Sequence, residues 1–176
     1  ITNGERDIIL FASNGKAARF NESAVRSMGR ISRGVRGIRM ADDQSVIGMV
    51  VPVEHGKVLT VSENGYGKRT DVEEFPAKGR GGQGVIAMTA SERNGALVGA
   101  VQVLDGEELM LISDQGTLVR TRVDEVSVLS RNTQGVRLIK LRDNEHMSGV
   151  ARIEEPEEDD TDVEGEAASD EPAAEE

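Results

Sequence analysis

The sequence predicts an all-β fold in which a small antiparallel sheet is repeated, like the blades of a propeller. Three landmarks recur in three copies at a period of about fifty residues, which is the signature of a repeat architecture. They are a turn ending in Gly, a Gly-Val pair that begins 19 residues later, and a further Gly that opens an apolar run. The turn glycines are Gly15, Gly65 and Gly116, the pairs begin at Gly34, Gly84 and Gly135, and the last glycines are Gly48, Gly99 and Gly149.

The composition agrees with this fold class. The 176 residues include 20 Gly and only 4 Pro, which suits many short strands joined by tight turns. With 3 Phe, 1 Tyr and no Trp, the core must be built mainly from aliphatic side chains. The absence of Cys excludes a disulfide framework and a thiolate metal site, and it fits a reducing cytoplasm. No apolar stretch approaches the roughly 20 residues that a membrane span needs, so we expect no membrane contact.

Each copy opens with a short apolar strand, reverses at the turn glycine, and returns as a strand that carries basic residues. Glycine and asparagine supply the positive φ that such a reversal needs. The opening strands are expected at residues 8–11, 58–61 and 109–112, and the return strands at 16–20, 68–70 and 119–123. A third strand is expected to start at each Gly-Val pair and a fourth after each last glycine, at 49–53, 100–103 and 150–153.

Four short strands per copy predict one blade each, at residues 1–55, 56–105 and 106–153. The alternative is three independent domains, but a unit of about fifty residues cannot bury enough surface alone. Roughly four to eight blades close a propeller, so three leave it open. We therefore expect further blades upstream of Ile1, or an open edge. The lack of an initiator Met indicates a piece cut from a longer chain.

Charge is distributed very unevenly along the chain. The formal net charge is −11, but residues 154–176 contain 13 of the 32 acids and no Lys or Arg. The first 153 residues therefore hold 19 acids against 21 bases. This asymmetry points to nucleic acid or to an interaction tail. The tail has no apolar period, and we expect it to be disordered because it cannot bury enough surface to offset its ordering entropy.

The sequence offers little support for a catalytic site. The only histidines, His55 and His146, lie in predicted turns without a companion at ligand spacing, so no metal site is predicted. Adjacent acids fall in polar connections, where a solvated bend is the usual explanation. Tyr66 follows a turn glycine, and packing or hairpin support is a better explanation than a nucleophile. We predict no catalytic residue in this chain.

Basic residues recur at equivalent points of the copies and form the candidate binding site. If the copies are arranged radially, these cations could form a curved belt that holds duplex DNA by its phosphates, with strong salt dependence. Scarce aromatics argue against base stacking, and no recognition helix is apparent. The alternatives are solvated strand faces and a protein-interaction scaffold. The candidate DNA-binding residues are Lys16, Arg19, Arg30, Arg33, Arg36, Lys68, Arg69, Lys78, Arg80, Arg120, Arg122, Arg131 and Arg137.

A glycine-rich stretch at residues 78–84, Lys-Gly-Arg-Gly-Gly-Gln-Gly, belongs to the same group of features. No Gly-Lys-Ser/Thr follows, so it is not a Walker A loop, and it lacks the context of a dinucleotide fingerprint. Its cations and amides could approach a phosphate backbone closely. A long loop made of turn residues is an equally good explanation from these residues alone.

Four features together carry a resemblance: the repeat period, the segment 121–123 (Thr-Arg-Val), the string 131–136 (Arg-Asn-Thr-Gln-Gly-Val) and the acidic tail. Through these features the chain resembles the C-terminal domain of DNA gyrase A. That resemblance implies the last three blades of a six-bladed β-pinwheel that wraps duplex DNA on its basic perimeter. It also implies a non-catalytic part of a bacterial, ATP-dependent type II topoisomerase that introduces negative supercoils. Its partners would be the rest of the gyrase A polypeptide and the gyrase B polypeptide in a heterotetramer. ATP and magnesium would be used elsewhere, so this chain needs no cofactor.

Two features qualify the resemblance. The family's heptapeptide, Gln-Arg-Arg-Gly-Gly-Lys-Gly, is not intact here, and residues 78–84 match it only at Arg80, Gly81, Gly82 and Gly84. The related polypeptide of topoisomerase IV has a similar but degenerate pinwheel, so it is the alternative. The acidic tail and three well-kept copies favour the gyrase family. A tail tethered beside a cationic rim is also expected to compete with DNA phosphates.

Overall fold

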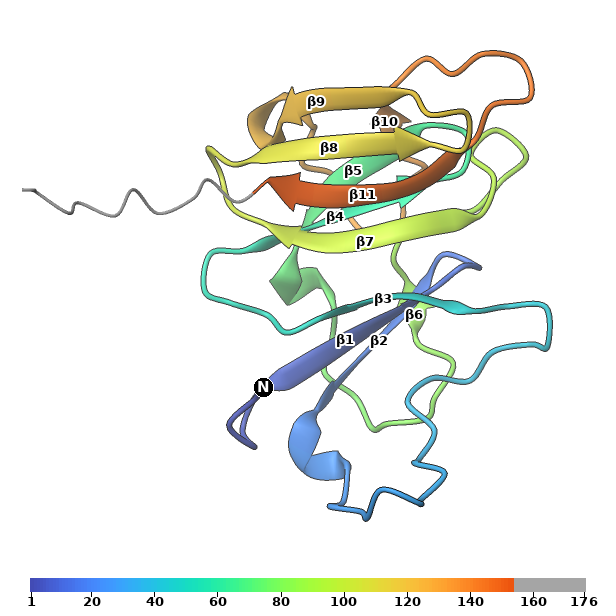
Figure 1. Cartoon of the computed structure of the whole chain (residues 1–176). Coiled ribbons are helices and arrows are strands. Elements are labelled where there is room, and N and C mark those ends of the chain that lie inside the picture. Colours follow the sequence, from blue (N-terminus) through green and yellow to red (C-terminus); the bar gives the residue numbers. More distant parts are fainter. Residues whose placement is uncertain (154–176) are drawn as a thin grey trace, which may run out of the picture.

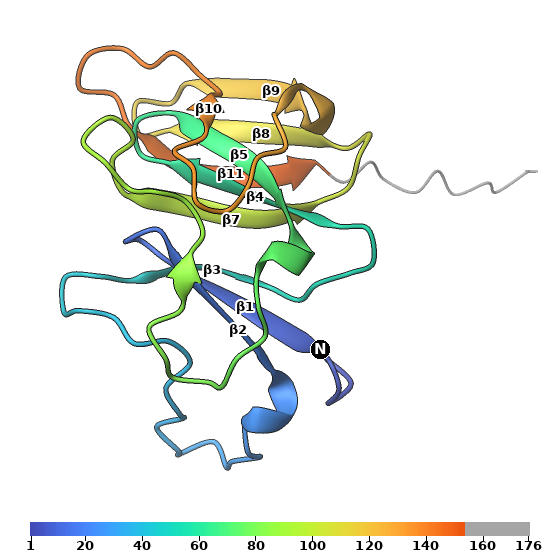
Figure 2. The same ribbon diagram turned by 180° about the vertical axis from the view of Figure 1, so that it is seen from behind.

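The computed structural model describes residues 1–153, and the tail predicted to be disordered lies outside them. These residues form three small antiparallel sheets, shown from two sides in Figures 1 and 2. We call residues 1–55, 56–105 and 106–153 repeats one, two and three. The first sheet lies at one end of the molecule, and the second and third sheets lie together at the other end (Figure 1).

The centre of each sheet is a hairpin closed by the turn glycine. The hairpins are β1 (Asp7–Ala12) with β2 (Lys16–Asn21), β4 (Lys57–Ser62) with β5 (Tyr66–Asp71), and β8 (Glu108–Ser113) with β9 (Leu118–Arg122). Gly15, Gly65 and Gly116 have φ of 79°, 79° and 84°, which is why the reversal requires glycine. The predicted opening and return strands are confirmed, to within two residues at either end. A 3₁₀ turn follows each hairpin, at Glu22–Ala24, Val72–Glu74 and Val123–Glu125.

The last strand of each repeat pairs with its first strand, and it contains the glycine that was expected to precede it. These strands are β3 (Val46–Val50), β7 (Leu97–Val103) and β11 (Met147–Ile153), so the predicted starts were wrong. Each has a register shift just before its glycine. A Cβ on Gly48 would lie 2.8 Å from the Ala100 carbonyl oxygen, and one on Gly99 would lie 2.7 Å from Val150. Glycine at these positions therefore marks a β-bulge, and at Gly48 and Gly99 it also allows the neighbouring sheet to approach closely.

The Gly-Val strands do not join the sheets of their own repeats. β6 (Val85–Ile86) of repeat two pairs with β2, and β10 (Val136–Arg137) of repeat three pairs with β5. The sheet orders are therefore β3-β1-β2-β6, β10-β5-β4-β7 and β11-β8-β9. Figure 1 labels β6 beside β1, β2 and β3, apart from β4 and β5. The strand expected after Gly34 is absent from residues 1–153, where the Gly34-Val35 pair joins none of the three sheets.

The core lies between the sheets and is built mainly from aliphatic side chains, as predicted. One cluster includes Ile9, Val58 and Met88 and contains the edge-to-face pair Phe11–Phe75, whose ring centroids are 5.7 Å apart. A second cluster joins repeats two and three around Leu59, Leu109 and Leu111. Because each of these two larger clusters draws on two repeats, neighbouring repeats share a core instead of folding as separate domains.

A buried carboxylate, Glu145, fixes the bend that leads into β11. Its Oε1 accepts a hydrogen bond from the Ser113 hydroxyl at 2.6 Å, and its Oε2 accepts one from the Arg142 amide at 2.9 Å. Hydrogen bonds from Ser113, Thr117 and the Arg142 backbone lower the pKa of Glu145 to about 2. Gln44 occupies the equivalent position in repeat one, where its Oε1 accepts from the Ala41 amide. The repeat therefore tolerates a neutral side chain at this position.

Stability should depend on the charge of Glu145. Its pKa is depressed from 4.5 in the folded state, so its stabilising effect is present above pH 4.5 and is lost as pH falls towards about 2. We expect Glu145→Gln to be less stable than the unsubstituted chain at neutral pH, with a gap that closes over this window. Urea unfolding of both chains at a series of pH values measures the gap. A gap that stays constant with pH would contradict this role.

Candidate nucleic-acid interface

An arginine-rich loop, which we call the basic loop (residues 25–39), joins the 3₁₀ turn of repeat one to the bend before β3. It contains neither strand nor helix, and its Gly-Val pair joins none of the three sheets of residues 1–153. Its five arginines are exposed, and within residues 1–153 none of them forms an ion pair with an acid. They are Arg26, Arg30, Arg33, Arg36 and Arg39. Unpaired, exposed guanidinium groups are well suited to hold phosphates.

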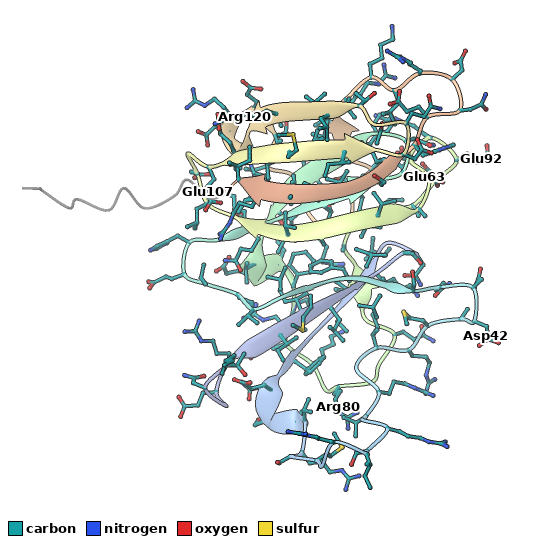
Figure 3. All side chains as sticks on the ribbon, viewed as in Figure 1. Asp42, Glu63, Arg80, Glu92, Glu107 and Arg120 are labelled. Atoms are coloured by element: carbon teal, nitrogen blue, oxygen red, sulfur yellow. The ribbon has the colours of Figure 1, made fainter. Side chains whose placement is uncertain are left out.

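The glycine-rich loop, residues 78–84, lies against the basic loop and shapes it. The Gly81 amide donates to the Gly37 carbonyl at 2.7 Å, and the Arg39 amide donates to the Gly82 carbonyl at 2.8 Å. A Cβ on Gly79 would meet nothing within 4 Å. Lys78 is exposed here and has no ion-pair partner among the described residues. Figure 3 shows Arg80 at this lower end of the molecule, where the two loops run together. The predicted phosphate approach by this loop is therefore sterically possible.

Arg80 and Arg131 hold neighbouring repeats together through hydrogen bonds to backbone carbonyl groups, and we call such arginines clamps. Arg80 donates to the carbonyl oxygens of Ala24 and Arg36, at 3.2 and 2.5 Å. Arg131 donates to those of Glu74 and Ile86, at 3.2 and 2.7 Å. Ala24 and Glu74 are equivalent positions in repeats one and two, and so are Arg36 and Ile86. Each arginine therefore holds the same two positions of the repeat that precedes its own. The recurrence of arginine at this position is therefore explained by contacts between repeats.

A second pair of clamps reaches forward to the next repeat. Arg19 donates to the carbonyl oxygens of Val72 and Phe75, at 3.0 and 3.2 Å, and forms an ion pair with Asp7. Arg69, at the equivalent position, donates to the Val126 carbonyl oxygen at 2.7 Å. The Arg69 side chain is only 8% exposed, so its prediction as a DNA contact is corrected.

The prediction that Lys68 contacts DNA is also corrected, because its side chain is completely buried. Its ammonium group donates to the carbonyl oxygens of Ser130 and Arg131, at 2.7 and 2.5 Å, and to the Thr133 hydroxyl at 3.0 Å. Burial lowers the pKa of Lys68 to about 8. The ammonium thus holds the loop that carries repeat three onto the sheet of repeat two. It cannot reach a DNA phosphate while that loop is in place.

The remaining predicted residues fall into two groups. Arg120 is paired with Glu108, the Arg122 guanidinium lies 3.8 Å from an Asp124 carboxylate oxygen, and Arg137 donates to the Tyr66 hydroxyl at 2.9 Å. Lys16, Arg30, Arg33, Arg36 and Lys78 have no ion-pair partner within residues 1–153. Among the predicted residues, those without an ion-pair partner therefore concentrate on repeat one and the loop packed against it, not along an even belt. Arg26 and Arg39 belong to the same group of exposed arginines, but the list of candidate DNA-binding residues left them out.

A second basic surface surrounds Tyr66. The Arg93 guanidinium lies 4.3 Å from the centre of the Tyr66 ring, and that of Arg137 lies 5.5 Å from it. Hydrogen bonds from Arg137 and Arg93 lower the pKa of Tyr66. A hollow of about 430 Å³ opens beside the ring, lined in part by Lys140 and Arg142. The ring is buried at the start of β5, and its hydroxyl accepts the hydrogen bond from Arg137, so Tyr66 supports the hairpin.

Two features are absent from residues 1–153. These residues contain no helix that is long and apolar enough to cross a membrane. They also contain no group of three or more His, Cys, Asp or Glu side chains arranged to hold a metal ion.

Exchanged strands, shared cores and a three-fold internal repeat define a β-propeller-like repeat domain. The family model described as "DNA gyrase C-terminal domain, beta-propeller" matches residues 6–52, 56–103 and 107–154. The chain therefore belongs to the DNA gyrase C-terminal domain family, and the predicted resemblance is confirmed.

Curated relatives with similar sequences are DNA gyrase A polypeptides. The protein from Pseudomonas aeruginosa is 60% identical over 156 residues, which cover 89% of this chain and 17% of that protein. The one from Escherichia coli K12 is 50% identical over 170 residues, covering 96% and 19%. The one from Staphylococcus aureus is 39% identical over 171 residues, covering 96% and 19%. The chain thus spans less than a fifth of the length of these relatives.

Solved structures agree with the fold. A DNA gyrase A C-terminal domain matches with a TM-score of 0.79 and 26% identity, covering 86% of this chain and 52% of the other. The C-terminal domain of DNA topoisomerase IV matches with a TM-score of 0.81 and 20% identity, covering 87% and 48%. The second likeness shows the fold alone. The sequence relatives therefore favour the gyrase family over the topoisomerase IV alternative.

Proposed function

We propose that this chain binds and wraps duplex DNA through phosphate contacts on its basic surface. The observation that carries the proposal is the basic loop, whose five arginines are exposed and unpaired within the described residues. Guanidinium groups bind phosphates bidentately, and release of condensed counterions makes such binding favourable. The described residues contain no helix to enter a groove, so little sequence preference is expected.

The role within a larger enzyme is also a proposal. Because the chain covers only a small part of its relatives, we assign it a non-catalytic part in an ATP-dependent type II topoisomerase that introduces negative supercoils. The rest of the gyrase A polypeptide and the gyrase B polypeptide would be its partners in a heterotetramer in the bacterial cytoplasm. ATP and magnesium would act elsewhere in that enzyme. Family membership supports this assignment.

A salt titration tests DNA binding directly. We expect the chain to bind duplex DNA at low ionic strength, with log affinity falling by about 0.9 for each phosphate contact per unit of log salt. Five contacts from the basic loop would give a slope near −4.5 by the same relation, that is, roughly five times 0.9. A protein-interaction scaffold predicts negligible binding, and a flat slope would contradict phosphate recognition.

A measurement of DNA topology distinguishes wrapping from simple binding. If nicked circular DNA is sealed with the chain bound, wrapping of one handedness shifts the mean linking number in one direction. Bound chain that leaves the linking number unchanged would support binding without a wrap. The same preparation without protein is the control.

A further inference from the structure

Four exposed cations line the hollow beside Tyr66, and within residues 1–153 none of them forms an ion pair. One lies in the loop before β7, one lies on β10, and two lie in the loop that follows β10. They are Arg93, Arg137, Lys140 and Arg142, and we call the site that they line the Tyr66 hollow. A concave surface lined by one sign of charge attracts ligands of the opposite sign.

Tyr66 fixes two of these guanidinium groups. The Arg93 group lies 4.3 Å from the centre of the ring and donates to the Gln134 side-chain oxygen at 3.3 Å. The Arg137 group donates to the Tyr66 hydroxyl at 2.9 Å. Because a guanidinium carries several N–H donors, each group keeps donors for a ligand while its position is already fixed.

The loop that follows β10 is anchored at both ends, so its two cations are held at the hollow. The Leu138 and Ile139 amides donate to the Gly65 carbonyl oxygen at 2.8 and 3.3 Å. A Cβ on Gly65 would lie 2.7 Å from the Ile139 carbonyl oxygen, so glycine permits this close approach. At the other end, the Arg142 amide donates to Glu145 at 2.9 Å.

The repeat itself does not require these charges. At the junction of repeats one and two, the five equivalent positions, counted from the turn glycines and the Gly-Val pairs, carry a single cation. They hold Lys16, Ile86, Asp43, Thr89 and Ser91 in place of Tyr66, Arg137, Arg93, Lys140 and Arg142. The clamps recur because they join repeats, whereas the charges of the Tyr66 hollow belong to one junction alone within residues 1–153.

Two acids also line the hollow, and they do not balance its cations. Asp143 is exposed, and Glu145 is buried with both carboxylate oxygens already accepting hydrogen bonds. The His146 Nδ1 lies 3.5 Å from an Asp114 carboxylate oxygen, so this imidazole already has an acidic neighbour. Four cations against two carboxylates leave the hollow basic.

We propose that the Tyr66 hollow binds phosphate groups at a site separate from the basic loop. Guanidinium groups match phosphate oxygens bidentately, and several cations together suit a ligand with more than one negative charge. A hollow of about 430 Å³ falls within the usual range of ligand sites. The Tyr66 ring is buried beside Arg93, so it is not available to stack on a base. The site therefore recognises phosphate and not the base attached to it.

The hollow and the basic loop lie in different parts of the molecule. Figure 3 labels Glu63 and Glu92, the sequence neighbours of Asn64 and Arg93, well above Arg80, which lies where the basic loop runs. The phosphate groups belong either to the backbone of duplex DNA or to a free polyphosphate. The DNA source rests on the proposed function, and the free source does not.

Tyr66 itself reports on the site, because the chain contains 1 Tyr and no Trp. Hydrogen bonds from Arg137 and Arg93 lower the pKa of Tyr66, because they favour the phenolate. A phosphate held by the same guanidinium groups opposes this effect. We therefore expect pyrophosphate to raise the pKa of Tyr66 in an absorbance titration of the phenolate. Sodium chloride at the same ionic strength is the control for screening, and an equal rise in both salts would contradict the proposal.

Paired variants measure the affinity of the hollow. Lys140→Ala with Arg142→Ala removes two of its cations and keeps the Arg142 amide that donates to Glu145. In calorimetric titrations we expect this variant to bind pyrophosphate at least about tenfold more weakly. The control, Arg120→Ala with Arg122→Ala, removes the same charge from β9 and should bind pyrophosphate as the unsubstituted chain does. Thermal melts check that both variants fold.

Fluorescence anisotropy with a labelled short duplex tests the DNA source on the same variants. If pyrophosphate binds, a larger loss of duplex affinity in the hollow variant than in the control assigns the site to the DNA backbone, and equal losses assign it to a free polyphosphate. A chain that binds pyrophosphate but no duplex would end the proposed DNA-binding function and leave the hollow. A chain that binds duplex equally in both variants, while pyrophosphate neither binds nor raises the pKa of Tyr66, would overturn this inference alone.

Discussion

Replacing the five arginines of the basic loop by alanine is expected to lower the affinity for duplex DNA on the order of a thousandfold at low ionic strength. These side chains are exposed and face no acid within the described residues, so all five are available to phosphates. The slope of log affinity against log salt should become shallower by about 0.9 for each phosphate that the variant no longer binds. Fluorescence anisotropy with a short duplex, repeated over a salt series, measures both quantities.

A matched pair of double variants tests whether DNA affinity depends on the basic loop or only on net charge. Arg30→Ala with Arg33→Ala and Arg120→Ala with Arg122→Ala remove the same charge. The second pair of guanidinium groups already faces Glu108 and Asp124. The first double variant should therefore lose much more affinity than the second. Equal losses would mean that binding responds to overall charge and that the basic loop has no special role.

Phe75→Ala is expected to destabilise the chain by about 3–5 kcal/mol, the usual cost of deleting a buried aromatic ring. Phe75 is 1% exposed, and its ring packs edge-on against Phe11 of the neighbouring sheet. Deletion would open a cavity between repeats one and two. It would also loosen the turn whose carbonyl oxygen Arg19 holds. Because a whole domain is stable by only about 5–15 kcal/mol, such a loss is severe.

Urea denaturation of Phe75→Ala measures this cost, and Val128→Ala provides the comparison. Val128 is 43% exposed, so its truncation should change the free energy of unfolding by no more than about 0.5 kcal/mol. Similar values for the two variants would show that the Phe11–Phe75 contact does not hold the sheets together.

The hairpins could be predicted from sequence because their determinants are local. An apolar run, a glycine with positive φ and a return strand within a dozen or so residues leave few alternatives. The exchange of β6 and β10 could not be predicted in this way. A Gly-Val pair specifies a short strand, but nothing near Val85 or Val136 indicates which sheet will receive it. That choice depends on contacts between residues about seventy positions apart, such as Tyr66 with Arg137.

The binding site was predicted only in part, because recurrence of a charge does not reveal its partner. Arg19, Arg69, Arg80 and Arg131 recur for contacts between repeats, and the sequence pattern of a DNA-binding belt would be the same. Lys68 was predicted to contact DNA as one of the basic residues that recur on the return strands, and such a contact requires its face of the strand to be exposed. The loop at 130–133 covers that face, and it comes from more than sixty residues away. The arginines of the basic loop were predicted from the same recurrence, and they stay exposed because residues 25–39 join none of the three described sheets.

The strand exchange also has a consequence for how such a chain can lengthen or shorten during evolution. The unit that is duplicated in the gene, about fifty residues, is out of phase with the sheet that folds, since each completed sheet borrows its last strand from downstream. A deletion that ends between β5 and β10 would therefore strip the sheet of repeat two of its edge strand, although it removes no residue of β4 or β5.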